Sequence, residues 1–296
     1  MTEEEAAAVL SDSDDYRVLR RLNPDLIGMG ASEGETRRAV FLDSETTGTD
    51  VFTDEVIELS MVAFDYDPHC GVVTAVHEAE AFEGLRDPGR PIPPEAAKVN
   101  NITDEMVAGK SISDEEVEGF LEGVSLVIAH SASFDRPMVE KTWPVFRSLH
   151  WACSIEDVAW KERGFGSNSL EYLLMKQGIF FEGHRAKIDC LAGIALLAAP
   201  LPSGEPALQA LLESARKPRT VIRAVNSPFE TKDILKARGY RWDSAGRAWW
   251  TVTEDLDAEK DWLTEKVYGG RLPNIPMLRL TARDRFRPLS ELNDGM

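Results

Sequence analysis

The chain has 296 residues, of which 43% are hydrophobic and 28% charged, and its formal net charge is −18. This length suffices for one large domain or two smaller ones, each with its own core. No run approaches the roughly 18 apolar residues that a membrane span needs, so no membrane partner is expected. Cys70, Cys153 and Cys190 are far apart and match no metal-ligand spacing. With no signal-peptide pattern at the acidic N-terminus, they indicate reduced thiols in a cytoplasmic protein.

Charge is spread unevenly along the chain. Residues 216–296 hold 16 Lys and Arg against 12 Asp and Glu, whereas residues 1–215 hold 17 against 39. The acidic total argues against a nucleic-acid partner, because phosphate backbones repel an acidic surface. The basic C-terminal stretch predicts that a polyanion, if one binds, is held locally there.

The first strong element follows an acidic N-terminal lead, residues 1–37, for which we expect loose order and one short helix. Ala39-Val40-Phe41-Leu42 is a short apolar run typical of a buried strand. Asp43 and Glu45 come next, and both lie on one face because side chains alternate along a strand. Two acids at a buried strand end repel each other and are costly to desolvate, so they predict a cation site. Oxygen ligands favour Mg²⁺ or Mn²⁺; a solvated strand end is the alternative interpretation.

The elements after this strand alternate between strand and helix. Thr46, Thr47 and Gly48 offer hydroxyls, backbone donors and a residue without Cβ, suited to close approach by a ligand. We expect further strands at 55–64, 71–82 and 126–129, a Pro-rich loop at 87–94, and helices at 113–122, 168–174 and 186–199. Residues 130–135 lead into another helix, which continues through Phe146. Residues 151–159 read as a strand end that passes into a helix. The fold class predicted is α/β, a mixed sheet flanked by helices.

Two more acids stand where strand–helix units place functional side chains. Asp135 follows Phe134 at the junction of an apolar strand and a helix, and Asp189 lies in the first turn of an otherwise apolar helix. A partner for the helix dipole is the alternative role of Asp189. His184 precedes Asp189 by five residues and meets it only from the loop before the helix. There it is a candidate general base, or an exposed loop histidine.

The whole pattern resembles the DEDDh 3′–5′ exonucleases, the family of the proofreading epsilon subunit of bacterial replicative polymerase. The resemblance covers about residues 39–199 and rests on the three motifs that hold Asp43 and Glu45, Asp135, and His184 with Asp189. They read Leu42-Asp43-Ser44-Glu45-Thr46-Thr47-Gly48, Ala129-His130-Ser131-Ala132-Ser133-Phe134-Asp135 and His184-Arg185-Ala186-Lys187-Ile188-Asp189. Two places differ from the common family pattern: Ser131 stands where Asn is frequent, and Val99-Asn100-Asn101-Ile102 replaces Val-His-Gly-Ile.

The resemblance implies a ribonuclease H-like fold and hydrolysis assisted by two metal ions. By transfer, Asp43 would bridge both ions, Glu45 and Asp189 would hold the first, and Asp135 the second. His184 would take a proton from the attacking water. The substrate end would be bound by four residues: Thr46, Thr47, Gly48 and Phe134. The product would be a nucleoside 5′-monophosphate.

The C-terminal stretch reads as a separate small unit. Basic residues interleave with aromatic ones between Lys232 and Trp250, which suits single-strand binding, although the tryptophans can equally form the core of a small domain. The predicted organisation is a lead, an exonuclease domain, a linker with a helix, a small basic-aromatic α+β domain and an irregular tail. Their bounds are 1–37, 38–202, 203–218, 219–270 and 271–296.

Three functions follow from these observations. The first is a metal-dependent 3′–5′ exonuclease on single-stranded DNA ends, acting in proofreading or repair with a possible replication or repair protein as partner. The second keeps the site but takes RNA as substrate. The third is a nucleic-acid-binding module without turnover.

Overall fold

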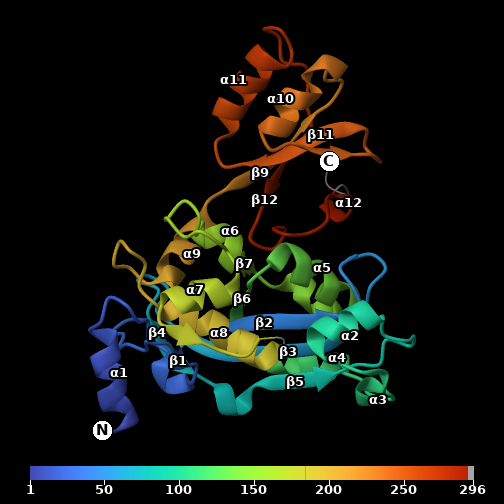
Figure 1. Ribbon diagram of the computed structural model, residues 1–296. Helices are drawn as coiled ribbons and strands as arrows, with labels where there is room; N and C mark the ends of the chain where they lie inside the picture. Colours follow the sequence, from blue (N-terminus) through green and yellow to red (C-terminus); the bar gives the residue numbers. More distant parts are fainter. Residues whose placement is uncertain (184, 293–296) are drawn as a thin grey trace. The chain divides into compact units, whose positions relative to one another are not determined.

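The central sheet of the first unit is built around β2, whose apolar run is wholly buried. The computed structural model describes residues 1–183 and 185–292, and these divide into two compact units, Met1–Ala215 and Arg216–Met296. The strands of the first sheet are β2 (Arg37–Thr46), β3 (Val56–Tyr66), β4 (Val73–Val76), β5 (Phe82–Leu85), β6 (Val124–Ala129) and β7 (Trp151–Cys153). Their order is β4-β3-β2-β6-β7, and β5 also pairs with β3 (Figure 1).

This sheet is mixed, as predicted. Strands β3, β4 and β5 run antiparallel to their neighbours, whereas β2, β6 and β7 are parallel to one another. The run expected as one strand at 71–82 is instead two strands, β4 and β5, separated by the 3₁₀ helix η2 (Glu78–Glu80). Both pair antiparallel with β3, β4 near its C-terminal end and β5 near its N-terminal end, so they follow the same edge of β3 one after the other.

Helices cover the sheet and carry the later acids. They are α2 (Pro94–Asn100), α3 (Asp104–Val107), α4 (Asp114–Phe120), α5 (Ala132–Thr142), α6 (Ser154–Val158), α7 (Leu170–Lys176), α8 (Ala186–Ala198) and α9 (Ala207–Arg216), with the 3₁₀ helix η3 (Pro144–Ser148) after α5. α8 packs across β2 and β3, while α5 packs against β2, β6 and β7 (Figure 1). The predicted α/β class with flanking helices is confirmed.

One close approach fixes how near α8 lies to the sheet. Gly193 faces Phe41, and a β-carbon at this position would overlap the Phe41 ring. Glycine is therefore required here for packing rather than for backbone freedom, and it lets the helix lie directly on the strand that carries Asp43. Phe41 itself has no exposed surface.

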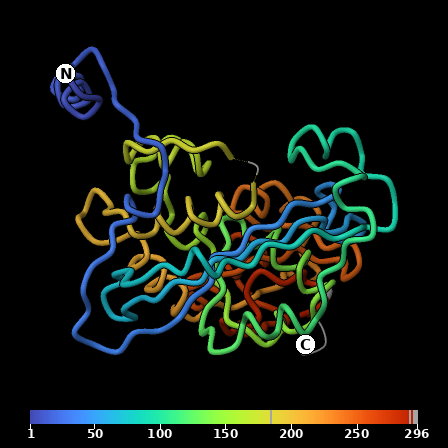
Figure 2. Tube along the Cα trace, turned by 90° about the horizontal axis from the view of Figure 1, so that it is seen from below, coloured from blue at the N-terminus to red at the C-terminus, as the bar shows by residue number. Residues whose placement is uncertain are grey.

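The N-terminal lead contains more structure than expected. Helix α1 (Glu3–Ser11) begins with a capping box between Thr2 and Glu5, yet none of its residues is buried. Figure 2 shows it, in blue, standing away from the rest of its unit. The short strand β1 (Arg20–Arg21) pairs with β8 (Ile179–Phe180), and the 3₁₀ helix η1 (Pro24–Leu26) follows. The lead is thus joined to the body by a two-stranded sheet.

The second unit is a four-stranded antiparallel sheet with helices. Its strands are β9 (Arg219–Ala224), β10 (Arg241–Asp243), β11 (Ala248–Thr253) and β12 (Met277–Leu280), in the order β10-β11-β9-β12, and its helices are η4 (Phe229–Thr231), α10 (Lys232–Ala237), α11 (Leu256–Lys266) and α12 (Leu289–Leu292). The predicted hairpin around 244–247 is present. The expectation of an irregular tail is wrong at β12, which pairs with β9. The other predicted domain bounds stay predictions.

Every helix in residues 1–183 and 185–292 is too short or too polar to span a lipid bilayer.

Candidate metal and catalytic site

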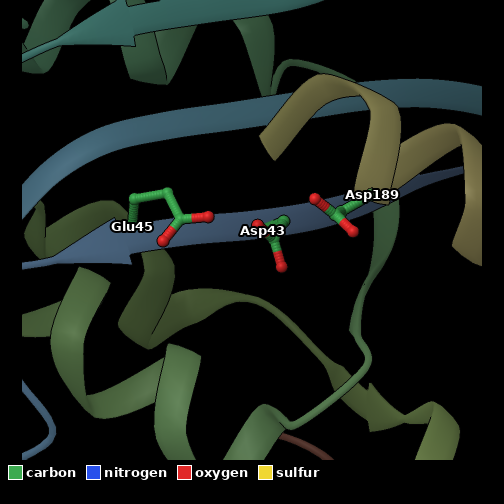
Figure 3. A group of neighbouring side chains, drawn as sticks. All are labelled: Asp43, Glu45 and Asp189. Carbon is green, nitrogen blue, oxygen red and sulfur yellow. The ribbon is translucent and has the colours of Figure 1, made fainter. Parts of the chain in front are cut away.

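Three carboxylates meet at the carboxyl end of β2. Oxygen atoms of Asp43, Glu45 and Asp189 all lie within 4.8 Å of one another. Figure 3 shows the first two on β2 and the third reaching over from α8. Asp43 and Glu45 share a face because they are two residues apart on the strand, as the sequence predicted. The side chain of Phe41 lies on that same face, so its contact with Gly193 brings Asp189 above the pair.

Asp135 approaches β2 from the opposite face. Its Oδ1 accepts a hydrogen bond of 2.8 Å from the hydroxyl of Ser44, whose side chain points away from α8 because it alternates with Asp43. Asp135 is not in the group of three within 4.8 Å, although its charge acts on both Asp43 and Glu45. Four of the predicted acids thus surround one strand end, three in close contact and the fourth held beside them by Ser44.

Burial and mutual repulsion raise the pKa values of Asp43, Glu45 and Asp135. Burial, followed by the charge of Asp189, raises the pKa of Glu45 to about 7. Burial also raises the pKa of Asp135 to about 7, against the hydrogen bond from Ser44 that lowers it. For Asp43, burial and then the charge of Asp135 raise the pKa well above the ordinary carboxyl range. A cation among these oxygens would remove the repulsion, so the site fits a divalent ion with hard oxygen ligands.

Hydrogen bonds within the protein fix the conformation of the Thr46–Gly48 segment. Thr46 Oγ1 donates to the Gly48 carbonyl at 2.7 Å. The Thr47 hydroxyl donates to Asp54 at 2.9 Å and accepts from the backbone N–H of Glu55 and from Arg90, each at 3.0 Å. A β-carbon at position 48 would collide with the Asp54 carboxylate. Thr47 is 1% exposed and its hydroxyl is fully used, so its visible role is to shape the loop. Substrate contact by Thr46, Thr47 and Gly48 stays a prediction.

A buried asparagine, which the sequence analysis named only as part of a departure from the family pattern, ties the end of α2 to this strand end. Asn100 Nδ2 donates to the carbonyl of Thr46 at 3.3 Å, and its Oδ1 accepts from the N–H of Ile102 at 3.0 Å. Asn100 stands in the segment that differs from the family pattern. An asparagine beside a Pro-rich loop carries no sequence signal of this role.

Two histidines belong to the motifs, and the structure describes only one of them, His130. His184 lies outside the described residues, so its predicted role as base stays a prediction. His130 is in the motif before Asp135, and burial lowers its pKa. Its Nε2 is 2.8 Å from the carbonyl oxygen of Asn168, so a proton on Nε2 donates to that oxygen. Its Nδ1 is buried and has no hydrogen-bond partner among the described residues. Phe134, the predicted neighbour of a bound nucleotide, is half-buried at the start of α5.

Glu58 is a further acid that the sequence analysis missed. It lies on β3 directly opposite Glu45, and its charge acts on both Glu45 and Asp43. Its position in a regular strand gives no motif, and only the antiparallel register of β2 and β3 could have revealed it.

Known proteins resemble this chain in the same region. The family model RNase_T, described as "Exonuclease", matches residues 40–197. DNA polymerase III subunit epsilon of Treponema pallidum (strain Nichols) is 36% identical over 95 residues, which are 31% of this chain and 40% of that protein. DNA polymerase III PolC-type of Thermotoga petrophila is 30% identical over 184 residues, 60% of this chain and 12% of that protein. This chain therefore spans less than half the length of either relative.

Among solved structures, exonuclease X in complex with 5′ overhanging duplex DNA aligns with 58% of this chain and 99% of its own. The TM-score is 0.41 and the sequence identity 24%.

Proposed function

The chain belongs to the exonuclease family RNase_T, whose model spans residues 40–197, and from this premise we propose that it hydrolyses DNA from 3′ ends. The substrate is a single-stranded end, and each cleavage releases a nucleoside 5′-monophosphate. One observation carries the proposal: three carboxylates from β2 and α8 lie within 4.8 Å, with Asp135 beside them.

The acids are proposed to hold two divalent cations, Mg²⁺ or Mn²⁺. Asp43 would contact both ions, Glu45 and Asp189 one of them, and Asp135 the other. Bound cations of this kind stabilise negative charge on the attacking and leaving oxygens of a phosphodiester. Ser44 keeps Asp135 in place through its hydrogen bond, and the contact of Gly193 with Phe41 keeps Asp189 over the strand.

His184 is proposed as the group that accepts the proton of the attacking water. The imidazole of histidine ordinarily ionises near neutral pH, so this residue type can both take up and release a proton during turnover. The terminal nucleotide would lie against the rigid Thr46–Gly48 segment and beside Phe134. A rigid loop suits this role because it places a strand end without rearrangement.

The second unit is proposed to bind the single-stranded DNA. Its residues carry a net positive charge, unlike those of the first unit. On β10, Trp242 is 52% exposed and packs edge-on against Trp249. The neighbouring Arg241 lies 5.7 Å above the ring of Trp250. Exposed aromatic rings next to guanidinium groups suit base stacking and phosphate contact. Trp249 packs on the core of this unit, so only part of the aromatic set is available.

A polymerase or another repair protein is proposed as a partner. The support is the likeness to a DNA polymerase III subunit epsilon and to a DNA polymerase III PolC-type, which covers only part of each relative.

The test uses a single-stranded DNA labelled at its 5′ end and the RNA of the same sequence, each with Mg²⁺ or Mn²⁺. We expect a ladder that shortens from the 3′ end, mononucleotides with 5′-phosphates, and blockage by phosphorothioates at the 3′ end but not at the 5′ end. Asp43→Asn should abolish cleavage, whereas Asp50→Asn, an exposed acid seven residues away, should not. Faster cleavage of the RNA would replace DNA with RNA as substrate. Binding without cleavage under either metal would leave a binding module.

A further inference from the structure

The N-terminal lead contacts the segment that joins α7 to α8. This segment leads directly into the helix that carries Asp189, and it contains the short strand β8. β8 pairs in parallel with β1 of the lead, and among the residues that the structure describes the two strands form a sheet of their own. Two stretches that are far apart in the sequence thus lie side by side, close to the acidic site.

Backbone hydrogen bonds hold the two stretches together. The N–H of Arg20 donates to the carbonyl of Gly178, and the N–H of Leu22 donates to the carbonyl of Phe180, each at 2.8 Å. Since the bonds come from the main chain, they depend on the presence of the lead and on its path rather than on one side chain.

Side chains add contacts around these bonds. Arg21 pairs with Glu182 at 3.2 Å and lies 5.0 Å from the centre of the Phe180 ring. The guanidinium of Arg17 donates to the carbonyl of Lys176 at 3.0 Å. Both partners of the ion pair are well exposed, and an exposed ion pair contributes little. The backbone bonds are therefore the main attachment.

The lead is itself anchored on the core of the first unit. Ile27 is buried in the main hydrophobic cluster, and Leu22 packs against it. On the other side of the pairing, Ile179 and Phe181 pack against the same cluster. Residues 17–22 therefore form a strap that is fixed at its C-terminal side and lies along β8.

The segment under the strap ends beside an acid of the site. A β-carbon at Gly183 would lie 3.5 Å from Oδ1 of Asp189 and 3.4 Å from Oε1 of Glu171. His184, the proposed proton acceptor, follows in the sequence and lies outside the described residues. A change in the path of residues 178–183 therefore changes the surroundings of Asp189.

We propose that the strap, residues 17–22, is a positioning element for the site. It fixes the path of residues 178–183 and so keeps the surroundings of Asp189 in the geometry that cleavage requires. It acts through that segment and contacts neither the substrate nor the cations. The proposal rests on the proposed function in one respect, namely that the acids carry out cleavage.

The test compares two variants of the full chain at one position. Arg20→Pro removes the N–H that donates to the Gly178 carbonyl, because proline has none. Arg20→Ala keeps this N–H and is the matched control. Both variants lose the exposed ion pair of Arg20 with Glu4, so a difference between them reports the backbone bond.

The first readout is amide hydrogen exchange of residues 178–183 without added metal. We expect Arg20→Pro to raise exchange there about fivefold, the effect of losing one backbone hydrogen bond, while Arg20→Ala stays near wild type. The second readout is single-turnover cleavage at saturating DNA and Mn²⁺, well below the melting temperature and per folded molecule. Arg20→Pro should slow it by a similar factor, which a contribution to global stability alone would not do.

A charge exchange tests the same contact through side chains. Arg21→Glu sets two negative charges against each other at Glu182 and removes the cation from the Phe180 ring. It should raise exchange of residues 178–183 and slow cleavage, and Glu182→Arg added to it should restore both. If Arg20→Pro does not fold, as judged by circular dichroism, this pair of variants decides.

Three results would overturn the proposal. They are unchanged exchange in Arg20→Pro, equal effects in Arg20→Pro and Arg20→Ala, and faster exchange with unchanged cleavage per folded molecule. The last result would leave the strap a purely structural role. Failure of the wild type to cleave DNA or RNA would sink the proposed function, while the exchange readout would still decide whether the strap holds the segment.

Discussion

Three of the acids around β2, namely Asp43, Glu45 and Asp135, have pKa values raised above those of ordinary surface carboxylates. In the unfolded chain they ionise near their usual values, roughly 4. In the folded chain, burial raises the pKa of Glu45 and of Asp135 to about 7. The native state therefore binds more protons than the unfolded state between roughly pH 4 and 7. Stability contributed by these groups is present below that window and is lost as the pH rises through it.

A dependence of cation binding on pH follows. Because a carboxylate must lose its proton to bind a cation, Mn²⁺ should raise the melting temperature more at pH 8 than at pH 6. Differential scanning calorimetry at both pH values, with and without Mn²⁺, measures this. Asp43→Asn should remove most of the difference. An equal or larger shift at pH 6 would contradict the reasoning.

Ser44 illustrates how a neutral side chain supports an acid. Ser44→Ala removes the hydrogen bond to buried Asp135 and should lower the free energy of unfolding by about 1 to 3 kcal/mol. Urea denaturation without metal checks this value. Ser125→Ala is the matched control, because its hydroxyl also donates to an oxygen, the Arg38 carbonyl, at a less buried place. That variant should change stability by less than about 0.5 kcal/mol.

At the scale of elements, helix α8 affects both the stability of the fold and the geometry of the acidic site. It carries Asp189 at its start and packs on β2 through Gly193 one turn later. Its height above the sheet is set by the contact of Gly193 with Phe41. This feature is tertiary and is not visible in the residues of the helix alone.

Gly193→Ala should therefore weaken both folding and cation binding. The added methyl group forces α8 away from Phe41, with a loss of about 1 to 3 kcal/mol in the free energy of unfolding. Chemical denaturation and Mn²⁺ calorimetry measure the two effects. Gly119→Ala in α4 is the control, because a β-carbon there meets nothing within 4 Å and alanine is the better helix former. It should leave stability unchanged or raise it. A second substitution, Phe41→Leu, should partly restore Gly193→Ala.

Prediction from sequence succeeded where the signal is local. The apolar run before Asp43 and the two-residue spacing of Asp43 and Glu45 identified the strand and its acidic face. Asp135 and Asp189 were placed at helix starts for the same reason. Glu58, Asn100 and Ser44 were missed because their roles depend on which strand lies next to β2 and on which loop packs against its end. Strand β12 was missed because four residues in a basic stretch show no clear alternation.

At the scale of the whole molecule, the chain divides charge between its two units. The body is strongly acidic and the C-terminal unit is basic. When basic residues bind a nucleic-acid strand, counterions are released, so the affinity falls steeply as the salt concentration rises. We therefore expect the affinity for single-stranded DNA to depend on the C-terminal unit and the rate of the chemical step to depend on the first unit.

Removal of residues 216–296 should lower affinity for single-stranded DNA and flatten its salt dependence, with a smaller effect on single-turnover cleavage at saturating enzyme. Fluorescence anisotropy at several salt concentrations and rapid-quench kinetics measure the two. Circular dichroism must first show that the shortened chain is folded. Within the full chain, Trp242→Ala should weaken binding by about 1 to 3 kcal/mol if that ring stacks on a base. Unchanged affinity in both variants would assign the C-terminal unit to another task.

The position of β2 has a practical consequence for how the protein loses activity on heating. It is paired on both edges, with β3 and β6, and its residues 39–42 have no exposed surface. Segments so enclosed open only when the whole domain unfolds. The acids at its end should persist until that point, so inactivation should coincide with the global melting transition rather than precede it. Stored or briefly heated samples would then contain either active or unfolded molecules, with few that are folded but inactive.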